Sequence, residues 1–241
     1  MLYLISLGLY DKNDVSLKAI SAAKKCKILY IERYTNFFGS SNKKLERLFK
    51  KKIIELKREE VESLKLINEA KKSDIGLLII GDVFSATTHS ALMLEAINKK
   101  IKVEAIHGSS ILTAIGETGL ILYNFGKIAS IPKENKNIET PYEALKGNNQ
   151  LHTLFLLDLD LSFNEAIEYL LYLEDKKKEK IFNPERLCVV CCQIGGKNII
   201  KSGKAKDLLK LKIKDKPQCL IVPGKLHFLE EEMIEKWNIS K

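Results

Sequence analysis

A dense group of hydrogen-bonding side chains follows one apolar run in the first half of the chain. The run "DIGLLII" (residues 74–80) leads into "GDVFSATTHS", which carries Asp82, Thr87, Thr88 and His89. A short aliphatic run of this kind predicts a buried strand, and open parallel sheets bind ligands beyond the carboxyl ends of their strands. Asp82 is therefore placed to accept hydrogen bonds from a hydroxyl or ammonium group of a ligand.

The threonines and the histidine also have a structural explanation. The stretch "HSALMLEAINKK" predicts a helix, for which Thr88 is a suitable N-cap. His89 falls in the first turn of that helix, where the positive end of the helix dipole opposes a proton, so a cationic acid is not expected there. The chain has four histidines and no second carboxylate close to His89, so this segment does not predict a metal site.

Three further turns follow predicted strands and carry groups that could contact a ligand. "LISLGLYDKND" includes Gly8 but lacks the G-x-G-x-x-G fingerprint, and an ordinary β-turn explains it equally. The serines of "HGSSI" (107–111) suit a carboxylate or phosphate, or they cap a helix. "VPGKLHF" (222–228) places His227 before an acidic helix. No Ser-His-Asp order, phosphate loop or paired glutamates stand out, so the pattern predicts a small-molecule cleft without naming the molecule.

The elements that must position these turns alternate between strand and helix. Apolar runs predict strands at residues 2–9, 27–34, 52–56, 75–80, 102–107, 127–132, 152–160, 186–194 and 218–224. Helical patterns fill the intervals, with Asp14 and Ser162 as expected N-caps. In the first half of the chain this alternation predicts a mostly parallel sheet with helices on both faces, and the second half keeps the alternation with a different texture. A Gly-Ser turn at "HGSS", where the pattern changes, predicts two α/β domains, residues 1–108 and 109–241.

Composition and charge exclude several classes of protein. No apolar run approaches the roughly 20 residues of a membrane span, and the first residues lack a basic leader, so a soluble, cytoplasmic protein is expected. The net charge is +9, and residues 1–108 carry 20 Lys and Arg against 13 Asp and Glu. Lysines on the solvent faces of helices account for this excess. No aromatic residues interleave with them, so direct nucleic-acid binding is not predicted.

The five cysteines do not predict a metal or redox centre. Cys188 and Cys191 have C-x-x-C spacing, but they lie inside the β-branched, apolar stretch "RLCVVCCQIGG" without a second ligand pair. Buried free thiols in a reducing compartment are the better interpretation.

Several stretches are shared with a known family. "GLYD", "ATTHS", "LHTL" and "VPGKLH" occur in this order, and the chain resembles from end to end the diphthine synthases, S-adenosylmethionine-dependent methyltransferases of the tetrapyrrole-methylase-like superfamily. The resemblance implies two α/β domains with the cofactor cleft between them. It also implies methylation of the amino group on the aminocarboxypropyl-histidine of translation elongation factor 2, giving diphthine in diphthamide biosynthesis. The expected cofactor is S-adenosyl-L-methionine, with S-adenosyl-L-homocysteine as product and no metal, and the expected assembly is a homodimer.

The same resemblance implies cofactor contacts from both halves of the chain. They are Leu9, Asp82, Ser85, Ser110, Ile111, Leu157, Ile194 and His227. Asp82 would accept polar hydrogens of the cofactor, and the leucines and isoleucines would form apolar walls. A sulfonium is a good leaving group, so the reaction needs mainly alignment and a neutral amine, and no catalytic base is named.

Departures from the family pattern fall on this proposed pocket. Ser6 stands where the family usually has glycine, Val83 replaces a proline, Ser85 replaces a valine, and "CQIG" (192–195) replaces "ARAG". Two alternatives therefore stay open. One is a tetrapyrrole or ribosomal RNA methyltransferase of the same fold, and the other is a non-catalytic protein that binds elongation factor or RNA through its basic first half.

Overall fold

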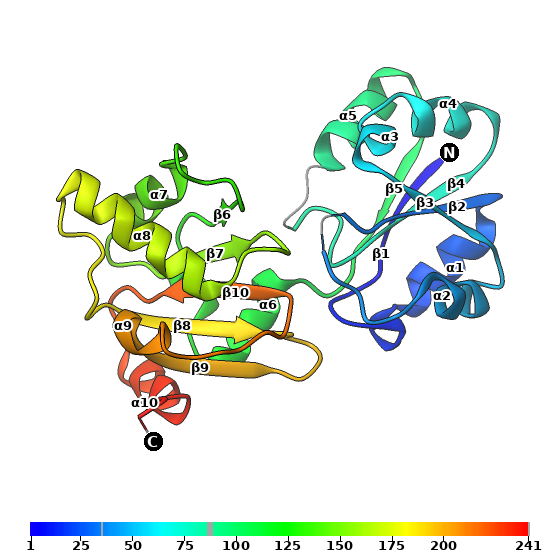
Figure 1. Ribbon diagram of the computed structural model, residues 1–241. Helices are drawn as coiled ribbons and strands as arrows, with labels where there is room; N and C mark the ends of the chain where they lie inside the picture. Colours follow the sequence, from blue (N-terminus) through cyan, green and yellow to red (C-terminus); the bar gives the residue numbers. More distant parts are fainter. Residues whose placement is uncertain (35, 86–88, 241) are drawn as a thin grey trace. The chain divides into compact units, whose positions relative to one another are not determined.

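The chain folds into two compact units, each built on a five-stranded sheet (Figure 1). The computed structural model describes residues 1–34, 36–85 and 89–240. The units are Met1–Ala114 and Ile115–Lys241. Both combine helices with a sheet, which confirms the predicted α/β class. The domain boundary expected after residue 108 stays a prediction, since the division seen here falls after Ala114.

The sheet of the first unit is entirely parallel, as the alternation of strand and helix predicts. Its order is β3-β2-β4-β1-β5, so β1 lies between β4 and β5. The strands are β1 (Leu2–Ser6), β2 (Ile28–Glu32), β3 (Ile53–Leu56), β4 (Ile75–Ile79) and β5 (Val103–Ile106). Because all five run the same way, the turns after β1, β4 and β5 meet at one edge of the sheet.

Helices cover both faces of this sheet, as Figure 1 shows. They are α1 (Leu17–Lys25), α2 (Asn42–Phe49), α3 (Arg58–Val61), α4 (Lys65–Lys72) and α5 (His89–Asn98). A 3-10 turn at Lys12–Asp14 and the short helix α6 (Ile111–Ala114) complete the unit. Alternate residues of β1 enter different cores. Tyr3 and Ile5 pack with α1 and α2, whereas Leu2 and Leu4 pack with α3, α4 and α5. The strands are therefore buried on both sides, which explains their continuous apolar runs.

The predicted N-cap of α1 is wrong by two residues. The Ser16 hydroxyl, not Asp14, accepts the Ala19 N–H at 3.0 Å and starts the helix. The Asp14 carboxylate instead turns back and accepts the N–H groups of Tyr10 and Asp11 at 2.7 and 3.0 Å. Asp14 therefore stabilises the turn after β1 and not the helix.

The sheet of the second unit is mixed. Its order is β6-β7-β10-β8-β9, with one parallel pair, β6–β7, and antiparallel pairs elsewhere. The strands are β6 (Ala129–Ile131), β7 (Thr153–Leu157), β8 (Leu187–Cys192), β9 (Ile199–Lys204) and β10 (Gln218–Val222). β9 is not predicted from the sequence, because its only signal is the short stretch "IIKSGK", which ends in glycine and lysine. Its pairing with β8 makes it a strand.

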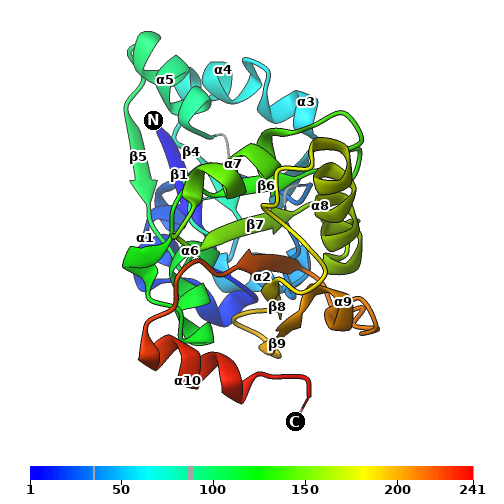
Figure 2. The same cartoon turned by 90° about the vertical axis from the view of Figure 1, so that its left-hand side faces the viewer.

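Helices complete the second unit. They are α7 (Thr140–Asn148), α8 (Phe163–Lys177), α9 (Ala205–Leu208) and α10 (Phe228–Lys236), with 3-10 turns at Ile115–Thr118 and Leu122–Asn124. Ser162 caps α8 as predicted, with a reciprocal bond from its own N–H to Glu165. In Figures 1 and 2, α10 lies at the β9 edge of the sheet, where the Ser202 hydroxyl donates to the Ile234 carbonyl at 2.7 Å.

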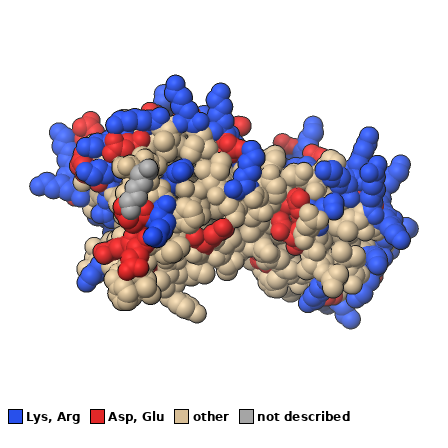
Figure 3. Space-filling view, turned by 90° about the horizontal axis from the view of Figure 1, so that it is seen from below, with Lys and Arg blue, Asp and Glu red and all other residues tan. Residues whose placement is uncertain are grey.

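The two units differ in how many of their basic side chains form ion pairs. Among the described residues, none of the lysines and arginines of α1 and α2 forms an ion pair, whereas many of the second unit's lysines do. Figure 3 shows many lysine and arginine side chains over the first unit, at the right of the view. All five cysteines are buried and unpaired as disulfides. No described helix is long and apolar enough to cross a membrane.

Gly76 and Gly147 offer a matched test of the packing. A Cβ on Gly76, the second residue of β4, would lie 2.9 Å from Leu29 Cδ2 and 3.0 Å from Cys26 Sγ, whereas a Cβ on the exposed, helical Gly147 would meet no described atom within 4 Å. We expect Gly76→Ala to lower the free energy of unfolding by about 1–3 kcal/mol through overpacking. Gly147→Ala should raise it by about 0.5–1 kcal/mol, because alanine favours the helix. Urea unfolding followed by circular dichroism measures both, and equal effects would contradict this account of β4.

Candidate active site at the strand ends of the first unit

The turns after β1 and β4 are joined by a pair of backbone hydrogen bonds. The Gly81 N–H donates to the Gly8 carbonyl at 2.8 Å, and the Gly8 N–H donates to the Gly81 carbonyl at 3.3 Å. Both glycines have positive φ, +85° and +84°. A side chain on Gly8 would also collide with Asp14, whose Cβ would lie 2.4 Å away, while the space beside Gly81 holds no described atom within 4 Å. The backbone of Gly81 is therefore open to close approach by a ligand.

Asp82 connects the turn after β4 to the turn after β5. One of its carboxylate oxygens, Oδ1, accepts the Phe84 N–H at 3.0 Å. The other, Oδ2, accepts the Gly108 N–H at 3.0 Å and lies 2.9 Å from Nδ1 of His107. The residue is only 7% exposed. The acceptor that the sequence predicts is present, and the protein itself already uses most of its hydrogen-bonding capacity.

The hydrogen bonds decide the charge of Asp82. Burial alone would raise the pKa of this carboxyl group, but the N–H groups of Phe84 and Gly108 and the side chain of His107 outweigh it and leave the pKa below its ordinary value. Asp82 is therefore ionised near neutral pH, and an ionised carboxylate can only accept hydrogen bonds.

Ser6 and Val83, two of the departures noted from the family pattern, are hydrogen-bond partners. The Ser6 side chain is 1% exposed, and its hydroxyl oxygen accepts the buried Val83 N–H at 2.9 Å. A proline at position 83 would have no N–H, and a glycine at position 6 would have no acceptor. The two departures compensate each other, because Val83 introduces a buried N–H donor and Ser6 supplies its acceptor.

His89 is an internal part of the same turn. It begins α5, is 5% exposed, and makes a hydrogen bond to the Val83 backbone. Burial lowers its pKa, and that hydrogen bond only partly opposes the effect, so the imidazole is neutral near pH 7. This agrees with the expectation that His89 is not a cationic acid at the helix start. Thr87 and the expected cap Thr88 lie outside the described residues.

The other predicted contacts of the first unit gather at this strand edge. Leu9 follows the Gly8 bridge and is partly exposed. The Ser85 N–H donates to the Asp82 carbonyl at 3.1 Å, which closes a tight turn. Ser110 starts α6: its hydroxyl accepts the Leu112 N–H at 3.1 Å, so the capping explanation is realised. Ile111, partly exposed, is the first residue of that helix.

The predicted contacts of the second unit occupy three separate turns or strand ends. Leu157 is the last residue of β7 and is partly exposed, and Ile194 follows β8 and is 6% exposed. His227 caps α10 through its ring nitrogen, which accepts the Leu229 N–H at 3.4 Å. Their role as cofactor contacts stays a prediction, as does that of the five residues in the first unit.

Glu230 organises the motifs "LHTL" and "VPGKLH" in the second unit. It is fully buried, and its carboxylate accepts the N–H groups of Ile121 and His227, at 2.8 and 2.7 Å, and lies 2.9 Å from Nε2 of His152. The Gly224 N–H donates to Nδ1 of His152 at 3.0 Å, so this nitrogen bears no proton and Nε2 donates to Glu230. Both nitrogens of His152 are thus used to hold the turn that carries His227, and the residue has no capacity left for a ligand.

This chain is similar to proteins of known family. The family described as Tetrapyrrole (Corrin/Porphyrin) Methylases matches residues 1–208. Diphthine synthase of Methanocaldococcus jannaschii is 44% identical, and that of Methanosphaera stadtmanae 40%. The matches cover 98% of both chains in the first case, and 97% of this chain and 94% of the relative in the second. A crystal structure of diphthine synthase matches with a TM-score of 0.90 at 34% identity, covering 98% of this chain and 95% of that one.

The chain belongs to the diphthine synthases of the tetrapyrrole methylase family. Members of this family are S-adenosylmethionine-dependent methyltransferases, and so is this protein. The strand edge of the first unit has the groups that would suit such a cofactor: Asp82 would supply a buried negative charge for polar hydrogens, Leu9 and Ile111 are partly exposed apolar residues, and the backbone at Gly81 is open. When bound, the cofactor supplies an activated methyl group on a sulfonium.

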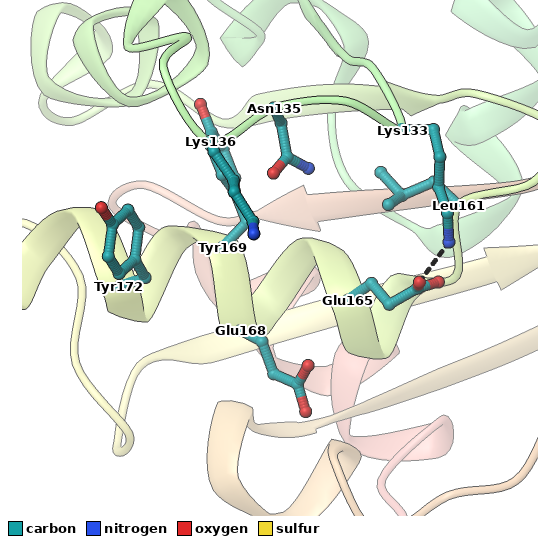
Figure 4. A pocket seen from close by; sticks show the side chains of 8 residues that line it. All are labelled: Lys133, Asn135, Lys136, Leu161, Glu165, Glu168, Tyr169 and Tyr172. Carbon is teal, nitrogen blue, oxygen red and sulfur yellow. Dashed lines mark hydrogen bonds and ion pairs between the residues drawn. The ribbon is translucent and has the colours of Figure 1, made fainter.

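A surface hollow of about 500 Å³ in the second unit has a different character (Figure 4). It lies between α8 and the segment after β6, and contains none of the predicted contacts. Lys133 pairs with Glu165, and the Tyr169 hydroxyl donates to the Ile138 carbonyl at 2.6 Å. The Lys133 contact and the hydrogen bonds from Ser162 lower the pKa of Glu165 to about 2. These groups attach the segment to the helix, so we assign the hollow no part in the reaction.

Sequence reasoning missed three polar residues that organise these turns: His107, His152 and Glu230. The turn "HGSSI" was considered for its serines, although the histidine that opens it contacts Asp82. His152 and Glu230 lie 78 positions apart, and only the motif matches "LHTL" and "VPGKLH" pointed to their surroundings. Glu230 itself looks like one of several surface glutamates in "LEEE".

Glu230 predicts a characteristic dependence of stability on pH. The N–H groups of His227 and Ile121 and the side chain of His152 outweigh burial and lower its pKa below the ordinary 4.5, so its contribution is complete above pH 4.5 and disappears as the pH falls through the lowered value. We expect Glu230→Gln to cost about 1–3 kcal/mol at pH 7, because a glutamine amide cannot accept all three bonds, and to cost less near pH 3. Trp237, the only tryptophan, reports unfolding of this unit. The exposed Glu231→Gln is the control, and a cost that does not change with pH would refute the explanation.

The hydrogen bond between Ser6 and Val83 predicts that substitutions at these two positions do not have additive effects on the free energy of unfolding. We expect Ser6→Ala to lower the free energy of unfolding by about 1–3 kcal/mol, since it leaves a buried N–H without an acceptor. The same substitution in a Val83→Pro background should cost clearly less, because the donor is then absent. A double-mutant cycle by urea unfolding measures this difference, and hydrogen exchange of the Val83 amide is an independent check. Additive effects would show that the two residues do not compensate each other.

Proposed function

We propose that this methyltransferase acts on the aminocarboxypropyl-histidine of translation elongation factor 2, methylates its amino group, and so forms diphthine, an intermediate of diphthamide. The observation that carries the proposal is the 44% identity, over nearly the full length of both chains, to a diphthine synthase. The retained motifs support it, because "LHTL" and "VPGKLH" form one buried hydrogen-bonded unit around Glu230.

The strand edge of the first unit suits a reaction that depends on alignment. An in-line displacement needs a correctly placed amine with a free lone pair, and it gains most from rigid positioning. Asp82 joins two turns, the Gly8–Gly81 pair joins a third, and Ser6 supports the backbone between them. The protein thus supplies turns with few remaining degrees of freedom, and Asp82 provides an acceptor for a polar hydrogen of the cofactor.

The proposal includes a protein partner, an assembly and a compartment. The substrate is a folded elongation factor, so the target histidine must reach the strand edge from outside. A homodimer and a cytoplasmic location complete the proposal, in keeping with five free, buried thiols that suit a reducing compartment.

The unpaired cations of α1 and α2 also suit an acidic partner, which is the basis of the non-catalytic alternative, but the family to which this chain belongs is one of methyltransferases. A surface of this kind attracts polyanions, and the attraction weakens steeply with salt. Cofactor titration separates the candidates, because only a methyltransferase needs saturable binding of S-adenosylmethionine. A methyltransferase of tetrapyrroles or ribosomal RNA shares that binding and is distinguished by its substrate.

Mass spectrometry of the substrate tests the proposal directly. We expect elongation factor 2 carrying the aminocarboxypropyl-histidine to gain whole methyl units after incubation with the protein and S-adenosylmethionine, and the unmodified factor to gain none. Asp82→Ala should weaken cofactor binding by about 1–3 kcal/mol, because it leaves buried donors unpaired. Cofactor binding without methyl gain would direct the search to other acceptors. Absence of both would refute the enzyme assignment for this chain.

A further inference from the structure

We propose that His107 is the proton acceptor of the methyl transfer, with Asp82 holding its ring so that Nε2 faces the incoming amine. This inference rests on the proposed function, since it requires an amine as the acceptor of the methyl group. It goes beyond the family resemblance, which implies no catalytic base.

The position of His107 suits this role. It is the first residue after β5, at the edge of the sheet that carries Asp82, Ser110 and Ile111. Its side chain is 68% exposed, while that of Asp82 is only 10% exposed. The ring therefore stands at the surface of the turn and is held from below by a buried carboxylate.

The hydrogen bond to Asp82 decides which ring nitrogen can react. Asp82 is ionised and can only accept, so the proton of their 2.9 Å contact belongs to Nδ1 of His107. In the neutral ring, Nε2 then has a free lone pair. Among the described residues no hydrogen bond reaches Nε2, and the Phe84 ring, 6.0 Å away between centroids, packs beside the imidazole. A base oriented by a carboxylate is the arrangement expected of a general base.

The other histidines lack this combination. His89 is buried and bonds to the Val83 backbone, and His152 uses both of its nitrogens. His227 uses a ring nitrogen to cap α10. His107 alone among them pairs a carboxylate on one nitrogen with exposure of the other.

The proposed step is a single proton transfer. The substrate amine arrives as an ammonium ion, which has no lone pair. Nε2 of His107 takes one proton, the amine nitrogen keeps the electron pair of that N–H bond, and the ring becomes an imidazolium stabilised by the Asp82 carboxylate. The neutral amine can then form the new N–C bond as the C–S bond of the methyl donor breaks. The imidazolium returns its proton to water before the next cycle.

Imidazole NMR tests the geometry without any reaction. In ¹⁵N-labelled protein free of cofactor, we expect the neutral form of His107 to carry its proton on Nδ1, and Asp82→Asn to weaken this preference. His107→Gln identifies the resonance by removing it. A neutral ring protonated on Nε2 would overturn the proposal.

Single-turnover kinetics test the chemistry. We expect His107→Gln to bind S-adenosylmethionine within about threefold of the unaltered protein, while methyl transfer slows by about a hundredfold at neutral pH. The deficit should shrink as the pH rises, because more amine then arrives without its proton. A purely structural role would produce a deficit independent of pH. The groups facing His107 among the described residues are Asp82 and the neutral Phe84 ring, so Asp82, already ionised, adds no titration over this range.

The controls separate this inference from the function on which it rests. Lys102→Gln, an exposed change just before the amino end of β5, should leave both binding and rate unchanged. If the unaltered protein transfers methyl groups and His107→Gln matches its rate, the inference is refuted and the function stands. If the unaltered protein transfers none to the elongation factor, the proposed function fails and the inference fails with it.

Discussion

The buried carboxylate of Asp82 is the constraint on which the strand edge of the first unit depends. A charge with 7% exposure is tolerated only if hydrogen-bond donors replace the lost water. Those donors come from its own turn, at Phe84, and from the turn after β5, at Gly108 and His107. Satisfying one charge therefore fixes two turns, and the Gly8–Gly81 bridge adds a third. The edge is ordered because the alternative is an unpaired buried charge.

Each unit contains a buried carboxylate that organises its turns, but the histidine beside that carboxylate has a different role in each unit. Asp82 and Glu230 are buried carboxylates that collect backbone N–H groups and one histidine from distant segments. The histidines differ in what remains available to them. His152 is fully buried with both nitrogens engaged, so it is a structural residue, whereas His107 engages one nitrogen and exposes the other. Exposure, and not residue type, distinguishes the group that can exchange protons from the one that cannot.

The contact between Ser6 and Val83 changes how departures from a family pattern are judged. Considered separately, serine in place of glycine at position 6 adds a side chain close to a ligand site. Valine in place of proline at position 83 makes the turn less rigid and introduces a buried N–H. Taken together, the serine oxygen accepts that N–H at 2.9 Å, and Gly108 leaves room for the serine Cβ. The substitutions that suggested a weakened pocket therefore restore a satisfied backbone, and the Asp82 turn keeps its support.

The sequence alone determined the α/β class, nearly all of the strands, the N-cap Ser162 and the choice of Asp82 as a strand-end acceptor. These features depend on neighbours in the chain: apolar runs predict buried strands, and a cap acts on a residue three positions away. Only the tertiary structure decided the mixed sheet of the second unit, the strand β9, and the partners of Ser6, His107 and Glu230. Those contacts join residues 77, 25 and 78 positions apart in the chain, so they depend on strand register and turn geometry. A histidine at a strand end looks the same in sequence whether it is buried or exposed, and its chemistry differs because folding selects which of its nitrogens is left open.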